Sequence, residues 1–159
     1  MPSIRPANRN DIPTILSLLR ELAAYEGNLE RVRIDETLLA EHAFSERACV
    51  ELRLGLLDGV PVAYALFFPH FASFRGLPWL YLEDLYVQPA ARGTGMGRAM
   101  MAHLAGLTLE RGWAGMVWGV LDWNQPAFAF YHRLGAARSN GHVSMELTGD
   151  ALRNLAEAT

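Results

Sequence analysis

The sequence predicts an α/β fold in which helices flank one mixed sheet. Three observations carry this prediction: helical spacing of apolar residues near the N-terminus, strand periodicity on both sides of an Asp-Gly turn, and a glycine-rich turn between a strand and a helix. In chain order the pattern gives two helices, three strands, a helix, a strand, a helix, a strand and a terminal helix. That order differs from the regular alternation of a doubly wound parallel sheet.

Two helices are expected before the first strand. Asn10, Asp11 and Pro13 mark the start of the first, which ends near Tyr25 and has apolar residues at helical spacing: Ile12, Ile15, Leu16, Leu19 and Leu22. The second begins at Asp35. Its solvated positions include Glu36 and Glu41, and its other face holds Leu38, Leu39 and His42.

The periodicity changes at Cys49. Apolar residues alternate with polar residues or glycine over 49–56, which indicates a half-buried strand. Asp58-Gly59 favours a tight hairpin turn because both positions tolerate positive φ, so the segment 60–68 should return antiparallel. The aromatic stretch 69–78 is expected to be a loop that can contribute to a site, and 80–87 the next strand.

Helices and strands alternate in the rest of the chain. Residues 89–93 break the preceding strand, and the helix expected over 95–110 has these inward positions: Met96, Met100, Leu104 and Leu107. The later elements are a strand at 116–121, a helix at 126–134 that Gly135 stops, a strand at 142–147 and a terminal helix at 150–158.

Length and composition fit one domain spanning residues 1–159. The chain has 159 residues, 51% hydrophobic and 19% charged, which suffices for one core but is cramped for two. A net charge of -3 gives no overall basic character, so no nucleic-acid partner is expected. All 14 basic residues are arginine, which excludes a lysine Schiff base and a Walker-type phosphate contact.

The sequence gives no support for a disulfide, a metal site or a membrane segment. Cys49 is the sole cysteine, and the five histidines form no His-x-x-x-His pair, so we assign no metal. Residues 1–10 lack the apolar core of a signal peptide, and no apolar run reaches the roughly 18 residues that span a bilayer. We therefore expect a cytoplasmic protein without a membrane partner.

A glycine-rich turn is the strongest candidate binding site. Gly93, Gly95 and Gly97 lie between a strand and a helix, where residues without Cβ let backbone N–H groups approach an anion. Arg92 and Arg98 flank the turn and can add charge-assisted contacts to a phosphate. The Rossmann fingerprint needs glycine at position 98, and the P-loop needs Lys-Ser/Thr after its last glycine, so neither motif fits. The alternative is a flexible turn packed against the sheet.

Two segments resemble motifs of the GNAT superfamily of acetyltransferases. Residues 92–97 (RGTGMG) are similar to its (Gln/Arg)-x-x-Gly-x-(Gly/Ala) signature, and 122–136 (DWNQPAFAFYHRLGA) to its second motif. The diamine (spermidine/spermine) and thialysine acetyltransferase branch is resembled further at IRPA (4–7), LAAYE (22–26), YLED (81–84) and Trp123-Asn124 with Pro126. This resemblance implies acetyl-CoA as cosubstrate, a mostly antiparallel sheet splayed near the middle of its fourth strand, and a homodimer.

The resemblance also assigns roles to individual residues. Glu83 is the general base and Tyr131 the general acid, while the amine site is formed by Tyr25, Glu26, Glu83 and Asp84. A backbone N–H near Leu85 meets the oxyanion. Acetyl-CoA is held by a larger set: Leu85, Tyr86, Val87, Arg92, Gly93, Thr94, Gly95, Met96, Gly97, Arg98, Asn124 and Tyr131.

Each role has a structural alternative. Glu83 and Asp84 also fit ordinary charges at a strand end, and Tyr25 with Glu26 fits the exposed end of a helix. Tyr131 fits a core aromatic beside two phenylalanines, and Asn124 fits a helix cap before a proline.

These observations predict an N-acetyltransferase that moves acetyl from acetyl-CoA to a primary amine of a small molecule. A diamine, a polyamine or a lysine-like amino acid would suit the carboxylates of Glu83 and Asp84, and direct attack in a ternary complex needs no covalent intermediate. Over 136–143 the chain lacks the branch's longer acidic stretch ending in Gly-Trp, which disfavours long polyamines and leaves a short diamine, a lysine-like amino acid or an amine-bearing drug as acceptors. The alternatives are a non-catalytic acyl-CoA-binding module and a protein or peptide N-acetyltransferase.

Overall fold

The computed structural model describes residues 1–139 and 144–158. Contacts divide the chain into two compact units, Met1–Leu121 and Asp122–Thr159. The first contains β1 (Pro2–Pro6), α1 (Ile12–Tyr25), α2 (Glu36–Phe44), β2 (Glu51–Leu57), β3 (Val60–Ala72), β4 (Leu77–Val87), α3 (Met96–Glu110) and β5 (Met116–Trp118). The second contains α4 (Gln125–Arg133) and α5 (Gly149–Glu157). Over the described ranges, no helix combines the length and the apolar character needed to cross a membrane.

One five-stranded sheet organises the first unit. Its strands lie in chain order, and neighbours are antiparallel except for the parallel pair β4 and β5. The prediction of a mixed, mostly antiparallel sheet is therefore confirmed. β1 was not predicted, because an edge strand of five residues with prolines at positions 2 and 6 offers too few alternating positions to recognise.

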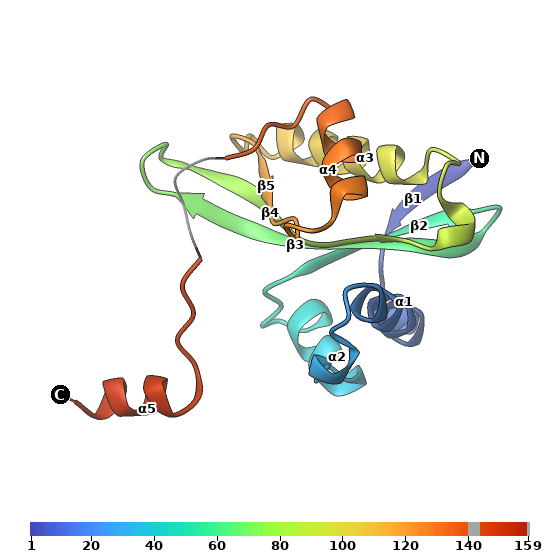
Figure 1. The fold of residues 1–159 in the computed structure, drawn as a ribbon. Coiled ribbons are helices and arrows are strands. Elements are labelled where there is room, and N and C mark those ends of the chain that lie inside the picture. Colours follow the sequence, from blue (N-terminus) through green and yellow to red (C-terminus); the bar gives the residue numbers. More distant parts are fainter. Residues whose placement is uncertain (140–143, 159) are drawn as a thin grey trace. The chain divides into compact units, whose positions relative to one another are not determined.

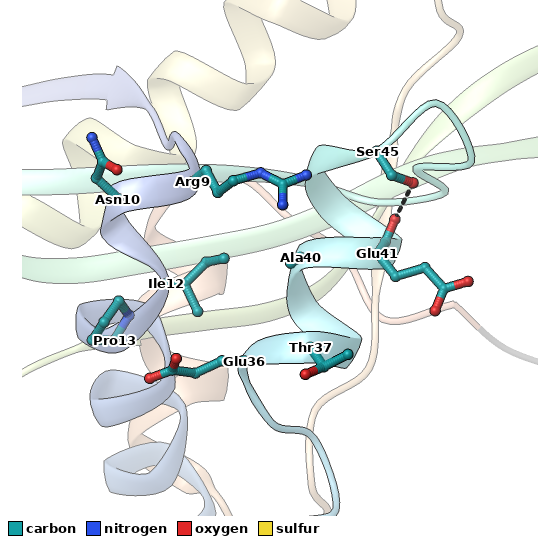
Figure 2. A pocket seen from close by; sticks show the side chains of 9 residues that line it. All are labelled: Arg9, Asn10, Ile12, Pro13, Glu36, Thr37, Ala40, Glu41 and Ser45. Carbon is teal, nitrogen blue, oxygen red and sulfur yellow. Dashed lines mark hydrogen bonds between the residues drawn. The ribbon is translucent and has the colours of Figure 1, made fainter.

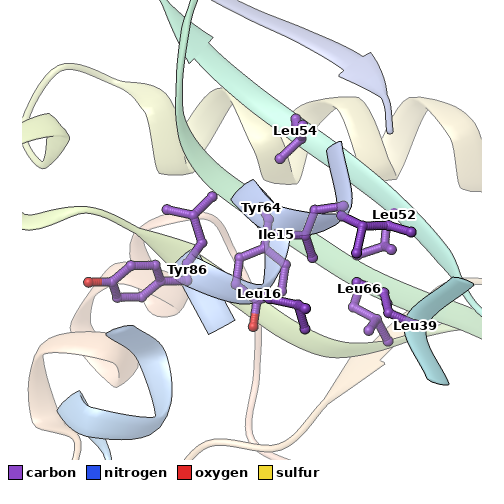
Figure 3. Packing of buried hydrophobic residues seen from close by; sticks show 10 residues of the cluster. Ile15, Leu16, Leu39, Leu52, Leu54, Tyr64, Leu66 and Tyr86 are labelled. Carbon is purple, nitrogen blue, oxygen red and sulfur yellow. The ribbon is translucent and has the colours of Figure 1, made fainter. Parts of the chain in front are cut away.

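Helices cover both faces of this sheet (Figure 1). α1 and α2 lie on one face, and α3 lies on the other. Figure 3 shows the core beneath α1 and α2, which is formed by Ile12, Ile15, Leu16, Leu18, Leu39, Leu52, Leu54, Tyr64, Leu66 and Tyr86. On the α3 face, Gly55 of β2 leaves room for the helix, since a Cβ at that position would lie 2.5 Å from the Met96 sulfur.

The first three expected strands differ from those observed. β2 is buried continuously over 52–55, not half-buried, because helices cover both faces of the sheet. The expected loop at 69–78 is instead the outer part of a hairpin, since β3 runs to Ala72 and β4 begins at Leu77. Aromatic pairs across the two strands extend it: Phe68 stacks on Tyr81 at 5.0 Å between ring centroids.

The described part of the strand expected at 142–147 is not a strand. Residues 144–147 have no strand conformation, and 142–143 lie outside the described residues. β5 is also shorter than the predicted 116–121 and ends at Trp118. Alternating apolar residues predict that a segment can pair, but pairing also needs a neighbour with the right register.

The helix positions agree with the prediction, whereas some of their details do not. Asp11 is the N-cap residue of α1, but its side chain makes no capping bond, because its carboxylate accepts from Arg5 at 2.7 and 2.8 Å and from the Asn8 amide of the preceding turn. Asp35 does cap α2. Two faces also differ from those expected: Leu39 is buried while Leu38, one position away around the helix, is 40% exposed, and Thr108 is buried where Leu107 was expected.

A hollow lies between the start of α1 and α2 (Figure 2). Six of the nine residues that line it have polar or charged side chains, and two of those side chains are already bonded within the protein. The Arg9 guanidinium donates to the Phe44 carbonyl at 3.0 Å, and the Ser45 hydroxyl donates to the Glu41 carbonyl at 2.5 Å. None of the site residues predicted from the sequence lines this hollow.

Candidate active site

The glycine-rich turn has the backbone geometry of an anion site. Gly93 and Gly95 have φ values of 80° and 90°, and α3 begins directly afterwards at Met96. Both glycines face open space, so the residue type is required by the backbone and not by crowding. In the described part of the chain no side chain caps the first turn of α3. Its backbone N–H groups and the positive end of the helix dipole therefore point outward, as a diphosphate requires.

Side chains fix this turn to the rest of the first unit. Met96 is buried, and the Thr94 hydroxyl donates to the Ala91 carbonyl at 2.7 Å. Arg92 Nε donates to the Val87 carbonyl at 3.1 Å, and the guanidinium lies 5.2 Å from the Tyr25 ring centroid. Arg92 therefore flanks the turn as predicted, and its side chain also contacts α1. Arg98 is exposed in the first turn of α3.

The sheet opens halfway along β4. β5 pairs with β4 only through Leu80–Leu82, and the described residues contain no strand beside β4 beyond that point. On the other side, Leu66 pairs with Asp84 and Phe67 with Leu82, so Glu83 is the extra residue of a β-bulge. The bulge and the end of β5 coincide, which produces the splayed fourth strand that the resemblance implied.

The open half of β4 presents backbone groups to its unpaired side. The Leu80 amide donates to the Gly115 carbonyl across the β4–β5 pair at 2.9 Å. Along a strand, the backbone N–H and C=O groups of successive residues point alternately to the two neighbouring strands, and the bulge shifts this alternation by one residue. The backbone groups of Leu85 and Val87 therefore point away from β3. The Arg92 bond to the Val87 carbonyl reaches β4 from that side. The Leu85 N–H is therefore available as a donor where an oxyanion contact was predicted.

Glu83 and Asp84 have different environments on the two sides of the bulge. Glu83 is exposed, whereas Asp84 is partly buried and accepts a hydrogen bond of 3.0 Å from the Tyr64 hydroxyl. Burial raises the pKa of Asp84 to about 6, the Tyr64 hydrogen bond opposes this rise, and the charges of Glu83 and Glu26 add to it. The three carboxylates are therefore close enough to act on one another, and together they favour a cation.

Tyr25 and Glu26 lie where α1 ends. Tyr25 is the last residue of α1 and is 42% exposed, and Glu26 is its C-cap. Burial raises the pKa of Glu26. The structure thus brings Tyr25 to Arg92 of the glycine-rich turn and Glu26 within electrostatic range of Asp84. Tyr25 is exposed, so the alternative of an exposed helix end also describes it, and the role of both residues in an amine site stays a prediction.

Two residues beside the candidate site were not predicted. Tyr64 donates to Asp84 from 20 residues earlier in the chain. Glu21 of α1 accepts from the Tyr86 hydroxyl at 3.1 Å and from Gln88 Nε2 at 2.9 Å. The available signal for Tyr64 was a phenol within an otherwise apolar strand, VAYALF at 62–67. Glu21 gave no comparable signal, because a single carboxylate near the end of an amphipathic helix is ordinary.

Asn124 and Tyr131 belong to the second unit. Asn124 Oδ1 accepts from the Ala127 amide at 3.2 Å, so Asn124 caps α4, as its structural alternative predicted. Its contact to acetyl-CoA stays a prediction. Tyr131 lies in α4 with its ring 5.1 Å from that of Phe130. Burial raises the pKa of Tyr131 to about 12, so its hydroxyl keeps its proton at neutral pH.

The fold and the two motifs coincide with a known family. Residues 14–136 match the acetyltransferase (GNAT) family, a range that includes the glycine-rich turn, the bulge and α4. The chain belongs to the acetyltransferase (GNAT) family. Enzymes of this family use acetyl-CoA as cosubstrate, which fits the outward amides at the start of α3. Over the described residues no group of three His, Cys, Asp or Glu side chains is arranged to hold a metal ion.

Individual relatives narrow the position within the family. A thialysine N-epsilon-acetyltransferase from Bos taurus is 34% identical over 164 residues, which cover 96% of each chain. An L-ornithine N5-acetyltransferase from Arabidopsis thaliana is 34% identical over 98 residues, 62% of this chain and 43% of its own. Among solved structures, an integron cassette protein from V. cholerae has a TM-score of 0.82 at 23% identity, covering 99% of this chain and 98% of its own. The chain lies in the diamine and thialysine branch.

Proposed function

We propose that this protein transfers an acetyl group from acetyl-CoA to a primary amine of a diamine, a polyamine or a lysine-like amino acid. The observation that carries the proposal is the placement of three carboxylates on one strand-turn-helix segment and the neighbouring end of α1. Glu83, Asp84 and Glu26 supply the negative charge that an ammonium group needs, next to amides suited to a diphosphate. The relatives named for thialysine and ornithine favour a lysine-like amino acid.

Glu83 is the proposed general base. A free alkylammonium has a pKa of about 10.4, so the amine must lose a proton before its nitrogen can attack. Glu83 is exposed at the bulge, where a substrate reaches it directly or through water. Asp84 lies beside it in a more buried position and is better suited to binding a cationic group than to exchanging protons with solvent.

The remaining steps need a donor for the oxyanion and an acid for the leaving group. When the nitrogen attacks the thioester, the carbonyl oxygen becomes negative and accepts from the Leu85 N–H. As the tetrahedral intermediate collapses, the C–S bond breaks and the thiolate of CoA takes a proton. Tyr131 is the proposed donor, because its hydroxyl is protonated at neutral pH. The nitrogen gives up two protons in all, one to Glu83 before the attack and a second as the intermediate collapses. The second replaces, through water, the proton that Tyr131 gave to the thiolate, and the proton on Glu83 passes to solvent, which balances the reaction.

A thiol-release assay tests this function. The purified chain is given acetyl-CoA and a panel of short diamines, spermidine, lysine, ornithine, thialysine and a lysine-containing peptide. Nε-acetyl-lysine is included as an acceptor whose side-chain amine is blocked. We expect at least one free side-chain amine to raise CoA release well above the no-acceptor rate. If acetyl-CoA binds and no amine raises the rate, the non-catalytic acyl-CoA-binding alternative is correct. If only peptides are acetylated, the peptide N-acetyltransferase alternative is correct.

Substituting the proposed acid separates catalysis from binding. Tyr131→Phe should lower kcat by about 10²-fold or more with little change in acetyl-CoA affinity. Tyr81→Phe removes a phenol that stacks on Phe68 in the hairpin and serves as the matched control. Equal loss of kcat and acetyl-CoA affinity in Tyr131→Phe would mean that Tyr131 is a structural aromatic residue.

Finer expectations accompany this function. We infer a homodimer in the cytoplasm and a single functional domain over 1–159, on the basis of the family resemblance and the composition. Light scattering of the purified chain measures its mass in solution, and a monomer at micromolar concentration would contradict the dimer. Cell fractionation tests the location.

A further inference from the structure

The Tyr64 hydroxyl is a buried polar group that the mechanism above does not use. Tyr64 is fully buried in the core beneath α1, and Figure 3 shows its ring among Ile15, Leu16 and Leu52. Such packing leaves the ring little freedom, so the direction of its O–H bond is set by the core. That bond is directed at Asp84 Oδ2, at 3.0 Å.

Asp84 is held at this position by the local strand geometry. Its pairing partner on β3 is Leu66, two residues along from Tyr64 on the same face of the sheet, and the bulge at Glu83 directs Asp84 toward that face. Without the bulge, the alternation of side chains would place Asp84 on the α3 face and away from Tyr64. The contact therefore depends on the same irregularity that opens the sheet.

We propose that Tyr64 is a positioning residue for the amine site: its hydroxyl holds the Asp84 carboxylate in its ionised form and fixes which oxygen stays available to the cationic substrate. This inference rests on the proposed function, in which Asp84 binds the ammonium group. One oxygen of Asp84 is engaged by Tyr64, and the other remains for the ligand.

The groups that act on Asp84 make such a donor necessary. Within the described residues these are Glu83 on its own strand, Glu26 at the end of α1 and Tyr64 on β3. Burial and both glutamates favour the protonated carboxyl, and the Tyr64 hydrogen bond alone among them favours the carboxylate. Burial and the nearby carboxylates raise the pKa of Tyr64 itself, so it remains a donor throughout the physiological range.

The test is the pH dependence of kcat/KM in Tyr64→Phe, measured with the best amine of the panel. The acid limb should move up by about one pH unit, because loss of a charge-assisted hydrogen bond favours the protonated carboxyl. Above the limb, the rates of the variant and the wild type should converge. Tyr81→Phe, which removes another phenol, should leave the limb in place.

In Glu26→Gln we expect the acid limb of kcat/KM to move in the opposite direction. This substitution removes a charge that favours protonation of Asp84, so the acid limb should move down. An unchanged limb in Tyr64→Phe, or an equal loss of rate at every pH, overturns the inference, since a merely structural defect is not pH-dependent.

A second measurement does not depend on activity. Carbon-13 NMR titration of the Asp84 carboxyl should show a higher pKa in Tyr64→Phe than in wild type. If no amine is acetylated but this pKa rises, the proposed function fails while the hydrogen bond still sets the charge of Asp84. If amines are acetylated and the pKa does not rise, the role given to Tyr64 is wrong.

Discussion

The glycine-rich turn at 92–98 and the carboxylate cluster of Glu26, Glu83 and Asp84 adjoin the same strand, yet they are constructed differently. The turn uses backbone amides, and its essential residues are glycines whose φ values other residues avoid. The cluster uses side chains from β4 and the end of α1, and a phenol from β3 supports it. Its geometry depends on long-range packing and on one extra residue in β4.

This difference matches the two tasks that we propose for these regions. A diphosphate is the same in every reaction of the family, and a local backbone motif suffices to bind it. The acceptor amine varies, and a cluster assembled from several elements can change one residue at a time. We therefore expect substitutions in the turn to affect acetyl-CoA binding for all acceptors, and substitutions in the cluster to affect catalysis and acceptor choice.

The largest expected effect is that of Glu83→Gln. Loss of the proposed base should lower kcat by about 10²–10³-fold while acetyl-CoA affinity, measured by calorimetry, stays within about twofold. Glu46→Gln, an exposed glutamate before β2, is the control for removing one negative charge. A wild-type kcat in Glu83→Gln would show that another carboxylate of the cluster is the general base.

Asp84→Asn should stabilise the protein while it impairs amine binding. The folded-state pKa of about 6 lies above that of a free carboxyl, so the folded state binds the proton more tightly than the unfolded chain does. Stability then falls as pH rises from about 4 to about 6, and the asparagine variant should lack this fall and gain roughly 2 kcal/mol at pH 7. Urea unfolding at several pH values measures it, and a variant less stable than wild type at pH 7 contradicts the assignment.

Gly95→Ala tests the turn alone. At a φ of 90° an alanine is strained although its Cβ would meet open space, so the loop should shift and acetyl-CoA affinity should fall about tenfold. The acceptor preference among amines should not change. Gly106→Ala, within α3 and also facing open space, is the matched control and should stabilise the helix slightly. Equal effects of the two substitutions would show that φ at position 95 is unimportant.

The smallest effect is expected where the two regions are joined. Glu21 accepts from Tyr86 and Gln88 at the end of β4, so Glu21→Gln should lower the free energy of unfolding by about 1 kcal/mol and change kcat less than threefold. Thermal unfolding and steady-state kinetics measure both. A large loss of kcat would instead place Glu21 in the catalytic machinery.

The sequence predicted the turn better than the cluster, for a physical reason. Gly93 and Gly95 signal a backbone conformation within a few residues of themselves, and Asp58-Gly59 likewise predicted the hairpin, where φ is 50° and 83°. Helix bounds followed from local spacing. The bulge at Glu83 has no local signature, and the partners Tyr64 and Glu21 are distant in the chain. The continuous burial of β2 depends on helices that cover both faces of the sheet, and the residues of β2 alone do not indicate such helices.

The close packing of Gly55 on Met96 links β2 to the helix end at which we propose that acetyl-CoA binds. Met96 is the first residue of α3, and its sulfur rests against bare backbone on β2. A side chain added at position 55 must displace that sulfur and would also crowd the Met100 sulfur at 3.1 Å, so α3 is expected to shift wherever these two side chains cannot repack. Random mutagenesis that selects for weakened acetyl-CoA binding should therefore recover changes in the middle of β2, and compensating changes should recur at the methionines of α3.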